Sequence, residues 1–371
     1  MKAAFQLAWV RAFRSKRGLP GSEKSSLIIV GGVAFVAALV MMFSATNIES
    51  TVGTARYFET NSYDYMAMQG GARSAMESST VSPELMKELR ASDAFEAVGV
   101  TWYFGKLEGR DVLYGMYRED GSTAPLLNSG RHLRTDSETV IDVGLAKSLG
   151  IKLGDKVDLV GKPYHVVGLS RETGSFGKEM VFVSEQAMFN LYGGLELYNS
   201  IAITQVGKPS TEDMFLLKKW ESQVDFLTKR EYIDGNVEYW ERNVSGLIYN
   251  IILVVTLLGA LGLAVIVAKQ LDLRLPSLGM LRAIGASHAQ LAGSESVALA
   301  CLTLTGLLVA IPVGWLLIQV INLGTPGFHA SLTIDSVMLA AAAVTLICVV
   351  CIIRLVRKVR KVTPMELMRG S

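Results

Sequence analysis

Four long runs without a charged residue constrain the fold of this chain more than any other feature. The runs cover residues 25–48, 243–268, 296–334 and 336–353 and are 24, 26, 39 and 18 residues long. A helix that crosses a bilayer needs about 20 apolar residues, so each run fits one span. The third run fits a span over 296–321, followed by a loop, 322–334, that contains Gly, Pro and polar residues. We therefore predict four transmembrane helices, over 25–48, 243–268, 296–321 and 335–353.

The distribution of Lys and Arg predicts the orientation of these helices. Residues 1–24 hold six Lys/Arg and one acid, 354–371 also hold six and one, and 269–295 hold three Lys/Arg, whereas 322–334 holds none. Positive flanks stay in the cytoplasm, so both termini and 269–295 are predicted to be cytoplasmic. Residues 49–242, with 21 Lys/Arg and 29 acids, then lie outside. Because the chain is acidic outside and basic inside, its net charge gives no argument for nucleic-acid binding.

The N-terminal flank, 1–24, has the pattern of an amphipathic helix. Over 3–17, apolar residues recur at helical spacing among basic ones, at Phe5, Ala8, Trp9, Ala12 and Phe13. Such a helix is expected to lie on the inner leaflet, and the alternative is a basic flank that only fixes the topology. The apolar run that follows is longer than the ~7–15 residues of a signal-peptide core, which favours a retained membrane anchor.

Residues 49–242 have the pattern of a mixed α/β domain. A helix is predicted over 81–96, because Ser82 can cap it and Pro83 suits its first position. Strands are predicted over 139–142, 157–160, 165–168 and 180–183, the second and third of them as a hairpin. The charged and aromatic stretch 215–242 is predicted to continue the second span outward as a rigid stalk.

Nothing in the sequence has the spacing of a catalytic or metal site. His132 and His165 have no neighbouring ligand residues, so we read them as ordinary surface or strand histidines. Cys348 and Cys351 form a C-x-x-C pair, but they lie in a predicted span, where they read as two small apolar residues. A membrane-anchored enzyme is therefore disfavoured.

Glu49 is the first carboxylate after the first span. It either lies among the lipid headgroups or is the polar group of a pocket lined by Met41 and Met42. Ionisable groups at membrane depth are costly and tend to be functional. Tyr239, before the second span, fits either an interfacial aromatic belt or a contact with substrate. Glu49, Met41, Met42 and Tyr239 are thus the candidate substrate-binding residues.

Small residues line one face of the second span. Ala260, Ala264 and Ala268 repeat every four residues, with Gly259 beside them. Small residues at this spacing allow two membrane helices to approach closely. Gly259, Ala260 and Ala264 are therefore candidate contacts of a dimer, although small residues are common in membrane spans.

The segment 269–295 joins the second and third spans on the predicted cytoplasmic side. Pro276 is predicted to start a short helix within it, and Gly285 to end or bend that helix. The apolar face of this helix is made of Leu278, Leu281 and Ile284. A helix with such a face can insert into a groove of a partner protein, and a plain connector loop is the alternative.

Four parts of the chain carry motifs that occur together in one family of permeases. They are residues 279–286, GMLRAIGA; Glu295 with Gly306 and Gly314; the tail residues Pro364, Glu366, Leu367 and Arg369; and the stretch 146–183. In these motifs, and in its order of one span, outer domain and three spans, the chain resembles the FtsX/MacB-like permeases of ABC transporters, the mechanotransmission type.

The resemblance implies a bacterial plasma-membrane protein that contacts lipid, pairs with a second copy and works with two copies of a cytoplasmic ABC ATPase. The ATPase would dock at Leu278, Leu281, Arg282, Ile284 and Gly285. The chain has no G-x-x-x-x-G-K-[ST] loop, so ATP would be bound and hydrolysed by the partner, and the chain itself is not predicted to be an enzyme. Motion would pass along stalks to the outer domain.

In its size and single compact outer domain the chain resembles the haem-efflux permeases of Gram-positive bacteria. Haem takes axial ligands such as His, Met, Tyr or Cys, and Met41, Met42, Tyr239 and His329 are predicted near the outer leaflet with Glu49. The resemblance implies export of a hydrophobic cargo, with haem as the first candidate, and neither a covalently bound cofactor nor a metal site. The alternative is a subunit that activates an extracellular cell-wall hydrolase or releases lipoproteins or peptides.

Overall fold

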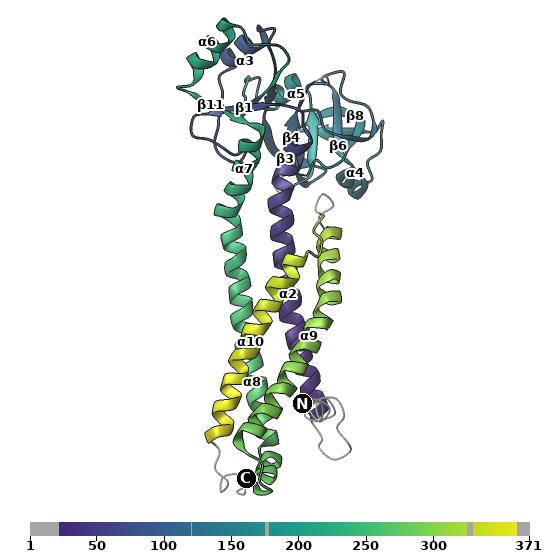
Figure 1. Ribbon diagram of the computed structural model, residues 1–371. Coiled ribbons are helices and arrows are strands. Elements are labelled where there is room, and N and C mark those ends of the chain that lie inside the picture. Colours follow the sequence, from purple (N-terminus) through teal and green to yellow (C-terminus); the bar gives the residue numbers. More distant parts are fainter. Residues whose placement is uncertain (1–21, 120, 175–177, 325–328, 362–371) are drawn as a thin grey trace. The chain divides into compact units, whose positions relative to one another are not determined.

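The computed structural model describes residues 22–119, 121–174, 178–324 and 329–361 (Figure 1). The chain divides into a helical unit, Met1–Asn47, Leu247–Ile321 and Ala330–Ser371, and an α/β unit, Ile48–Gly246 and Asn322–His329. The predicted amphipathic helix over 3–17 and the tail motif from Pro364 to Arg369 lie outside the described residues.

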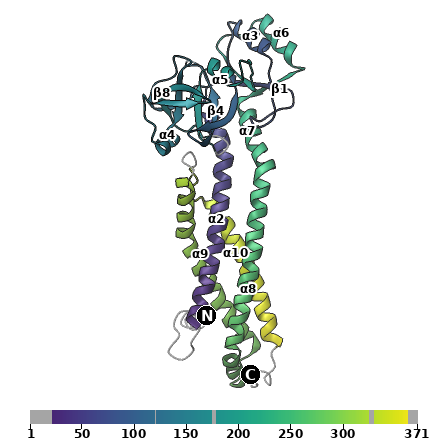
Figure 2. The same cartoon turned by 180° about the vertical axis from the view of Figure 1, so that it is seen from behind.

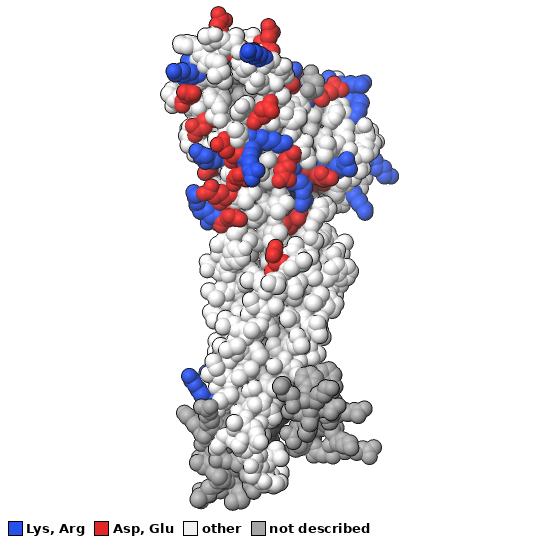
Figure 3. All heavy atoms as spheres, in the orientation of Figure 1, with Lys and Arg blue, Asp and Glu red and all other residues white. Residues whose placement is uncertain are grey.

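Within the described residues, four helices are long and apolar enough to cross a membrane, which confirms the predicted number of spans. They are α2 (Ser22–Thr60), α8 (Gly246–Ala283), α9 (His288–Gly324) and α10 (Ile334–Lys361) (Figures 1 and 2). On the face drawn in Figure 3, charged side chains crowd the α/β unit and are nearly absent from the described part of the helical unit. Apolar side chains such as Leu257, Leu261 and Leu316 are more than half exposed on these helices, as expected of surfaces that face lipid rather than water.

Helix α2 forms the centre of the helical unit. Its residues Ala37, Ala38 and Met41 are completely buried, in one apolar core that also holds side chains of α8, α9 and α10. Glycines let the neighbouring helices approach it, because a Cβ added at Gly306 of α9 would lie 2.7 Å from Val33. Close approach through small residues is how membrane helices gain packing contacts in the absence of water.

All four helices continue beyond their uncharged runs: α9 already begins at His288, and α10 reaches Lys361. Helix α2 extends to Thr60, past Glu49 and Arg56. Helix α8 is preceded by α7 (Lys229–Trp240) and a π-helical turn, η1 (Glu241–Ser245), so the backbone is helical from Lys229 to Ala283. The predicted stalk over 215–242 was therefore right only from Lys229, because the residues before it form the end of α6 (Thr211–Trp220) and the strand β11 (Val224–Thr228).

The described residues of the α/β unit form two sheets. The four-stranded sheet has the order β11-β1-β10-β2, with β1 (Tyr65–Gln69), β2 (Phe95–Val100) and β10 (Ser200–Gln205), and all its pairs are antiparallel. The seven-stranded sheet has the order β3-β4-β9-β6-β8-β5, with β7 also paired to β8. Its strands are β3 (Trp102–Leu107), β4 (Arg110–Met116), β5 (Leu127–Gly130), β6 (Glu138–Asp142), β7 (Lys156–Leu159), β8 (Lys162–Ser170) and β9 (Met180–Val183).

Each face of the four-stranded sheet has its own apolar core. On one face, Ala67 and Ile201 pack with side chains of α3 (Pro83–Arg90) and α6. On the other face, Met66 and Ala202 belong to a core that contains residues of α2 and α7. That second core includes edge-to-face aromatic contacts of Phe58 with Trp102 and Tyr232, a geometry that adds to the energy of area burial.

Most of the local predictions for this unit are confirmed. Strands β6, β8 and β9 cover the predicted stretches, β7 ends at Leu159, one residue before the predicted end at 160, and β7 and β8 form the predicted hairpin. Val160 and Gly161 both have positive φ, 53° and 80°, as a type I′ hairpin turn requires. The helix predicted over 81–96 was wrong at its end: α3 stops at Arg90, because Phe95 already pairs with Gln205 in the sheet. The helices α4 (Val143–Leu149) and α5 (Glu185–Leu191) complete the unit.

Candidate functional site

The turn between α8 and α9 is built from two local capping motifs. Gly285 has φ of +104°, and the amide of Ala286 donates to the carbonyl of Leu281 at 3.1 Å, which is the 6→1 bond of a Schellman motif. Ser287 and Gln290 then cap α9 reciprocally, each side chain accepting from the other's amide at 3.2 and 3.0 Å. The predicted role of Gly285 as the end of the helix is confirmed.

The segment before this turn differs from the prediction in two ways. There is no separate short helix starting at Pro276, because α8 runs without a break from Gly246 to Ala283. The predicted apolar face is also divided. Leu278 is only 6% exposed in the core of the helical unit, and Leu281 packs partly against the same core. The side chain of Arg282 lies outside what the structure describes.

Two apolar side chains do project from this turn. Ile284 is 84% exposed and Met280 is 64% exposed. Residues four apart lie on the same face of a helix, so these two side chains form one small apolar surface, which we call the turn surface. Met280 was not among the predicted docking residues, although its i, i+4 spacing from Ile284 would have indicated it.

Glu49, a candidate substrate residue, is paired within the α/β unit. Its carboxylate lies 2.9 Å from the guanidinium of Arg56, and it accepts a bond from the amide of His329 at 3.3 Å. Both side chains are mostly buried. Tyr239, the other candidate in this unit, is half-buried on α7. Arg56, which follows Glu49 by two helical turns, was not predicted as its partner.

Met41 and Met42, the candidates in the helical unit, differ in exposure. Met41 is completely buried, and a Cβ added at Gly314 would lie 3.3 Å from its sulfur, whereas Met42 is only partly buried. Met41 is therefore part of the packing between α2 and α9 in this structure.

The candidate dimer residues are covered within the chain. A Cβ at Gly259 would lie 2.6 Å from Val36 of α2. Ala264 is buried in the core of the helical unit, and Ala260 packs partly against that core. The small-residue face of α8 thus faces α2 of the same chain, and a dimer contact through it stays a prediction.

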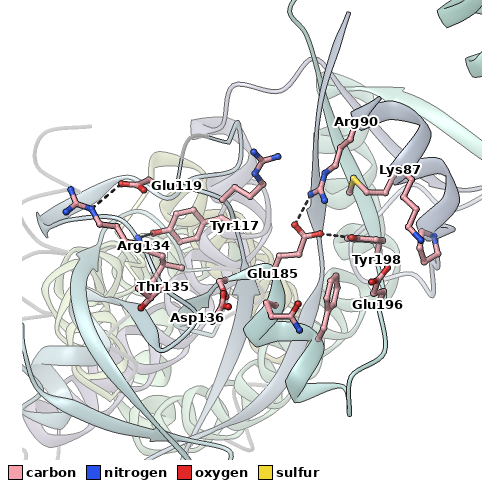
Figure 4. Close-up of a pocket in the computed structure, with 17 residues that line it drawn as sticks. Lys87, Arg90, Tyr117, Glu119, Arg134, Thr135, Asp136, Glu185, Glu196 and Tyr198 are labelled. Atoms are coloured by element: carbon pink, nitrogen blue, oxygen red, sulfur yellow. Dashed lines mark hydrogen bonds and ion pairs between the residues drawn. The ribbon is translucent and has the colours of Figure 1, made fainter. Parts of the chain in front are cut away.

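A cleft of about 590 Å³ opens in the α/β unit between α3 and the ends of β4 and β6 (Figure 4). Helix α3 and the segment before β10 form one wall. Residues 117–119, residues 133–136 and the first turns of α5 form the other wall. The floor is apolar and aromatic, and the rim carries charged side chains of both signs.

One carboxylate ties the two walls of this cleft together. Glu185, in the first turn of α5, accepts from the guanidinium of Arg90 at 2.8 Å and from the hydroxyl of Tyr198 at 2.5 Å. Arg90 also donates to the carbonyl of Ala97 at 3.2 Å. Burial raises the pKa of Tyr198, with a further contribution from Glu185, so the phenol remains a protonated donor.

A second carboxylate fixes the wall segment before β6. Glu138 lies 2.6 and 2.9 Å from two guanidinium nitrogens of Arg131 and accepts from the amide of Arg134 at 2.7 Å. These bonds to the charged form, above all those from Arg131, lower the pKa of Glu138 to about 2. Glu138 is therefore ionised at neutral pH and holds residues 131–135 in place.

The described residues show no centre for catalysis by a metal. In this part of the chain no group of three or more His, Cys, Asp or Glu residues could hold a metal ion. His132 lies against the ring of Tyr117, with its Nδ1 3.2 Å from the phenol oxygen.

Two family models together match most of the chain. The FtsX-like permease C-terminal model matches residues 249–364, and the MacB-like periplasmic core domain model matches residues 25–214. A search of curated proteins finds no significant match.

Solved structures resemble parts of the chain. The periplasmic region of MacB from Actinobacillus actinomycetemcomitans aligns over 50% of this chain and 96% of its own, with 13% identity and a TM-score of 0.38. The extracellular domain of the noncanonic ABC-type transporter YknZ from Gram-positive bacteria aligns over 44% and 98%, with 15% identity and a TM-score of 0.33. A domain of a putative permease from Porphyromonas gingivalis aligns over 46% and 88%, with 13% identity and a TM-score of 0.29.

The two family matches cover α2 with most of the α/β domain, and then the last three transmembrane helices. This is the order of elements that the structure shows, with one membrane helix, an extracytoplasmic α/β domain and three further membrane helices. The chain therefore belongs to the FtsX/MacB-like permeases of ABC transporters, and it is a multi-pass protein of the cytoplasmic membrane.

Proposed function

We propose that this permease is the membrane subunit of an exporter that moves a hydrophobic compound, with haem as the first candidate, out of the outer leaflet. Permeases of this family work with a cytoplasmic ABC ATPase, which supplies the hydrolysis of ATP. In the assembly that we propose, two copies of the chain pair and two ATPase copies dock on them. Both termini and the α8–α9 turn face the cytoplasm.

The turn surface is the observation that carries this proposal. Met280 and Ile284 project from a turn that is fixed on both sides by capping motifs. An apolar side chain that protrudes this far gains about 25 cal/mol for each square ångström of surface it buries in a partner's groove. Because the turn continues directly into α8, a displacement of the turn displaces that whole helix.

The motion can leave the membrane along the same backbone. The chain is helical from Lys229 to Ala283, with a single π-helical turn at Glu241–Ser245. Such a turn inside a long helix is a frequent feature of functional sites. The first turn of α7 carries Tyr232, which is fully buried in the core around Phe58 and Trp102, here called the aromatic core. A displacement of α7 is therefore transmitted to the four-stranded sheet.

For the cargo, we propose that the ion pair of Glu49 and Arg56 is the polar anchor. The sequence indicated Glu49 alone, but its carboxylate is already paired with Arg56. An acidic group of the cargo, such as a haem propionate, can replace Glu49 on the Arg56 guanidinium by the same charge-assisted hydrogen bonds. Met42 and Tyr239 remain candidate contacts for the apolar part. Met41 becomes available only if the helices around α2 separate.

The test is the ATPase activity of the permease and ATPase complex in nanodiscs, with haem added. We expect haem to stimulate hydrolysis, and Arg56→Ala to abolish the stimulation while leaving the basal rate unchanged. Glu59→Gln is the matched control, since Glu59 is an exposed carboxylate of α2 that forms no ion pair with another residue that the structure describes. Stimulation that is equal in Arg56→Ala and in wild type contradicts the role of the ion pair.

The second candidate is transmission of force to a partner outside the membrane. It is favoured by the aromatic core, where α2 and α7 join the α/β domain through Phe58 and Tyr232. The centroids of these two rings lie 4.9 Å apart. In this case ATP hydrolysis would be insensitive to haem and to lipid, and would instead respond to a cell-wall hydrolase, a lipoprotein or a peptide. The same nanodisc assay distinguishes the two functions.

A further inference from the structure

We infer that the cleft between α3 and the ends of β4 and β6 binds an extended segment of another protein, one that carries both acidic and basic side chains. Nothing in this inference depends on the turn surface or on the cargo, because the cleft lies wholly within the α/β unit.

The charges of the cleft are balanced, although those of the domain are not. Four cations and four acids line it: Lys87, Arg90, Arg118, Arg134, Glu119, Asp136, Glu185 and Glu196. Residues 49–242 as a whole hold 21 Lys/Arg against 29 acids. Each wall carries both signs, with Lys87 and Glu196 on one side and Arg134 and Asp136 on the other (Figure 4). Within the cleft, Arg90 already pairs with Glu185 and Arg134 with Glu119, and because each pair removes one charge of either sign, the remaining charges are still balanced. A ligand of a single sign would meet as many like charges as opposite ones, whereas a mixed-charge segment can pair with both.

The floor provides an apolar contact of the kind that binds peptides. Met86, Phe189, Tyr117 and Tyr198 form it, and because each is only 1–6% exposed, a ligand touches just the outer atoms of these side chains. Tyr, Phe, Met and Arg are the residue types enriched at protein interfaces, and Tyr and Arg dominate their energetic hot spots. The volume of about 590 Å³ lies within the range of about 300–1,000 Å³ that is typical of ligand sites.

The cleft is preformed. Glu185 joins α5 to Arg90 and to Tyr198 on the opposite wall, at 2.8 and 2.5 Å. Glu138 holds the segment that carries Arg134 through the amide of that residue, at 2.7 Å. Because these side chains are already ordered, a ligand does not have to supply the free energy of ordering them, which favours binding.

An apolar ligand such as an acyl chain has a better-suited groove in the same unit. That groove, of about 560 Å³, lies between α6 and the four-stranded sheet and is lined by Phe95, Phe215 and Phe226. In the cleft, such a ligand would remove water from the charged side chains of the rim without forming hydrogen bonds to them, which costs free energy. The cleft therefore selects a polar chain over a lipid.

The test uses the full-length protein in nanodiscs and a phage library of random linear peptides. Selection is carried out on the wild-type protein after depletion on Gln186→Trp, in which an indole replaces an exposed side chain of α5 that lines the cleft and takes up part of its volume. Two variants carry matched changes outside the cleft. Asn190→Trp places the same bulk on α5 and is the control for Gln186→Trp. The second cleft variant is Lys87→Glu, which reverses a charge in the last turn of α3, and its control is Lys147→Glu, which does the same in the last turn of α4.

We expect the enriched peptides to contain both acidic and basic residues. Their Kd should rise by about tenfold or more in Gln186→Trp and in Lys87→Glu, and should be unchanged in Asn190→Trp and Lys147→Glu. Three results overturn the inference. No peptide binds the wild-type protein in preference to the Gln186→Trp protein, or the enriched peptides all carry a single sign of charge, or the two cleft variants bind these peptides as wild type does. Binding of lipid vesicles that is lost in Gln186→Trp also overturns it.

Discussion

Replacing Gly306 by Ala is expected to destabilise the helical unit. The added Cβ would lie 2.7 Å from Cβ and Cγ1 of Val33 and 3.0 Å from the carbonyl oxygen of Val30. Neither the Val33 Cβ nor a backbone oxygen can move without shifting α2, and overpacking of this kind costs about 1–3 kcal/mol. Ala is the better helix former by about 1 kcal/mol, which offsets part of this cost.

A matched variant separates the two effects. At Gly262, also in a membrane helix, an added Cβ meets nothing within 4 Å, so Gly262→Ala changes helix propensity alone. The difference in unfolding free energy between Gly306→Ala and Gly262→Ala should therefore equal the cost of the clash, about 1–3 kcal/mol. We propose to measure it by SDS titration from dodecylmaltoside micelles, followed by tryptophan fluorescence.

A second substitution tests the cause of the effect. Val33→Ala removes the Cγ1 contact and leaves the Cβ contact, so in the Gly306→Ala background it should recover part of the lost stability. The reasoning is refuted if Gly306→Ala is as stable as Gly262→Ala, or if Val33→Ala gives no recovery in the double variant.

Three further predictions concern the α/β domain. In Gly235→Ala of α7 the new Cβ would lie 2.2 Å from the carbonyl oxygen of Arg73, so amide exchange around Arg73 should accelerate, whereas in Gly246→Ala, where nothing lies within 4 Å, it should not. Val160→Asn should raise stability by about 0.5–1 kcal/mol in thermal unfolding, because Asn tolerates the φ of 53° at this position better than a β-branched residue does; a loss of stability would contradict the turn geometry. The folded pKa of Glu138, about 2, is below its ordinary value of 4.5, so its stabilisation is present above pH 4.5 and is lost as the pH falls towards 2. The protection factors of the amides of residues 131–135 should fall over that range, and in Glu138→Gln they should be low already at neutral pH; protection factors that do not change with pH in wild type would argue against this role.

The membrane helices could be predicted because the bilayer limits which residues a segment that crosses it can contain. A charge in the hydrocarbon region is costly, so the uncharged runs mark the spans. The ends of the helices are not limited in this way, since a charged residue does not end a helix in water. Helix α2 therefore continues past Glu49 to Thr60, and the pairing of Glu49 with Arg56 two turns later could not be read from the end of the run.

The turn between α8 and α9 shows which part of a site is local. Gly285 and the Ser287 cap follow from backbone chemistry within a few residues, and Gly285 was predicted correctly. The direction of the side chains depends on where the remaining helices lie. Periodicity grouped Leu278 with Ile284, but the core of the helical unit takes Leu278 and leaves Met280 outside with Ile284.

The same limit applies to Gly259. Its spacing from the neighbouring alanines predicted the close approach of another helix, and such an approach exists. The helix that approaches is α2 of the same chain, through Val36. Small residues indicate how near a partner comes, and only the fold identifies that partner. The cleft beside α3 was not predicted at all, because its walls come from segments up to about a hundred residues apart in the sequence.

The most direct test of the account is co-purification of the ABC ATPase with Ile284→Lys. The substitution replaces an exposed apolar side chain by a cation at a helix C-terminus, where the helix dipole tolerates positive charge, so the fold should be retained. Leu195→Lys, at a similarly exposed apolar residue of the α/β domain, is the control. We predict that Ile284→Lys loses the ATPase and the ATP hydrolysis that co-purify with wild type, whereas Leu195→Lys keeps both. An Ile284→Lys protein that retains its ATPase at the wild-type ratio would contradict docking through the turn surface.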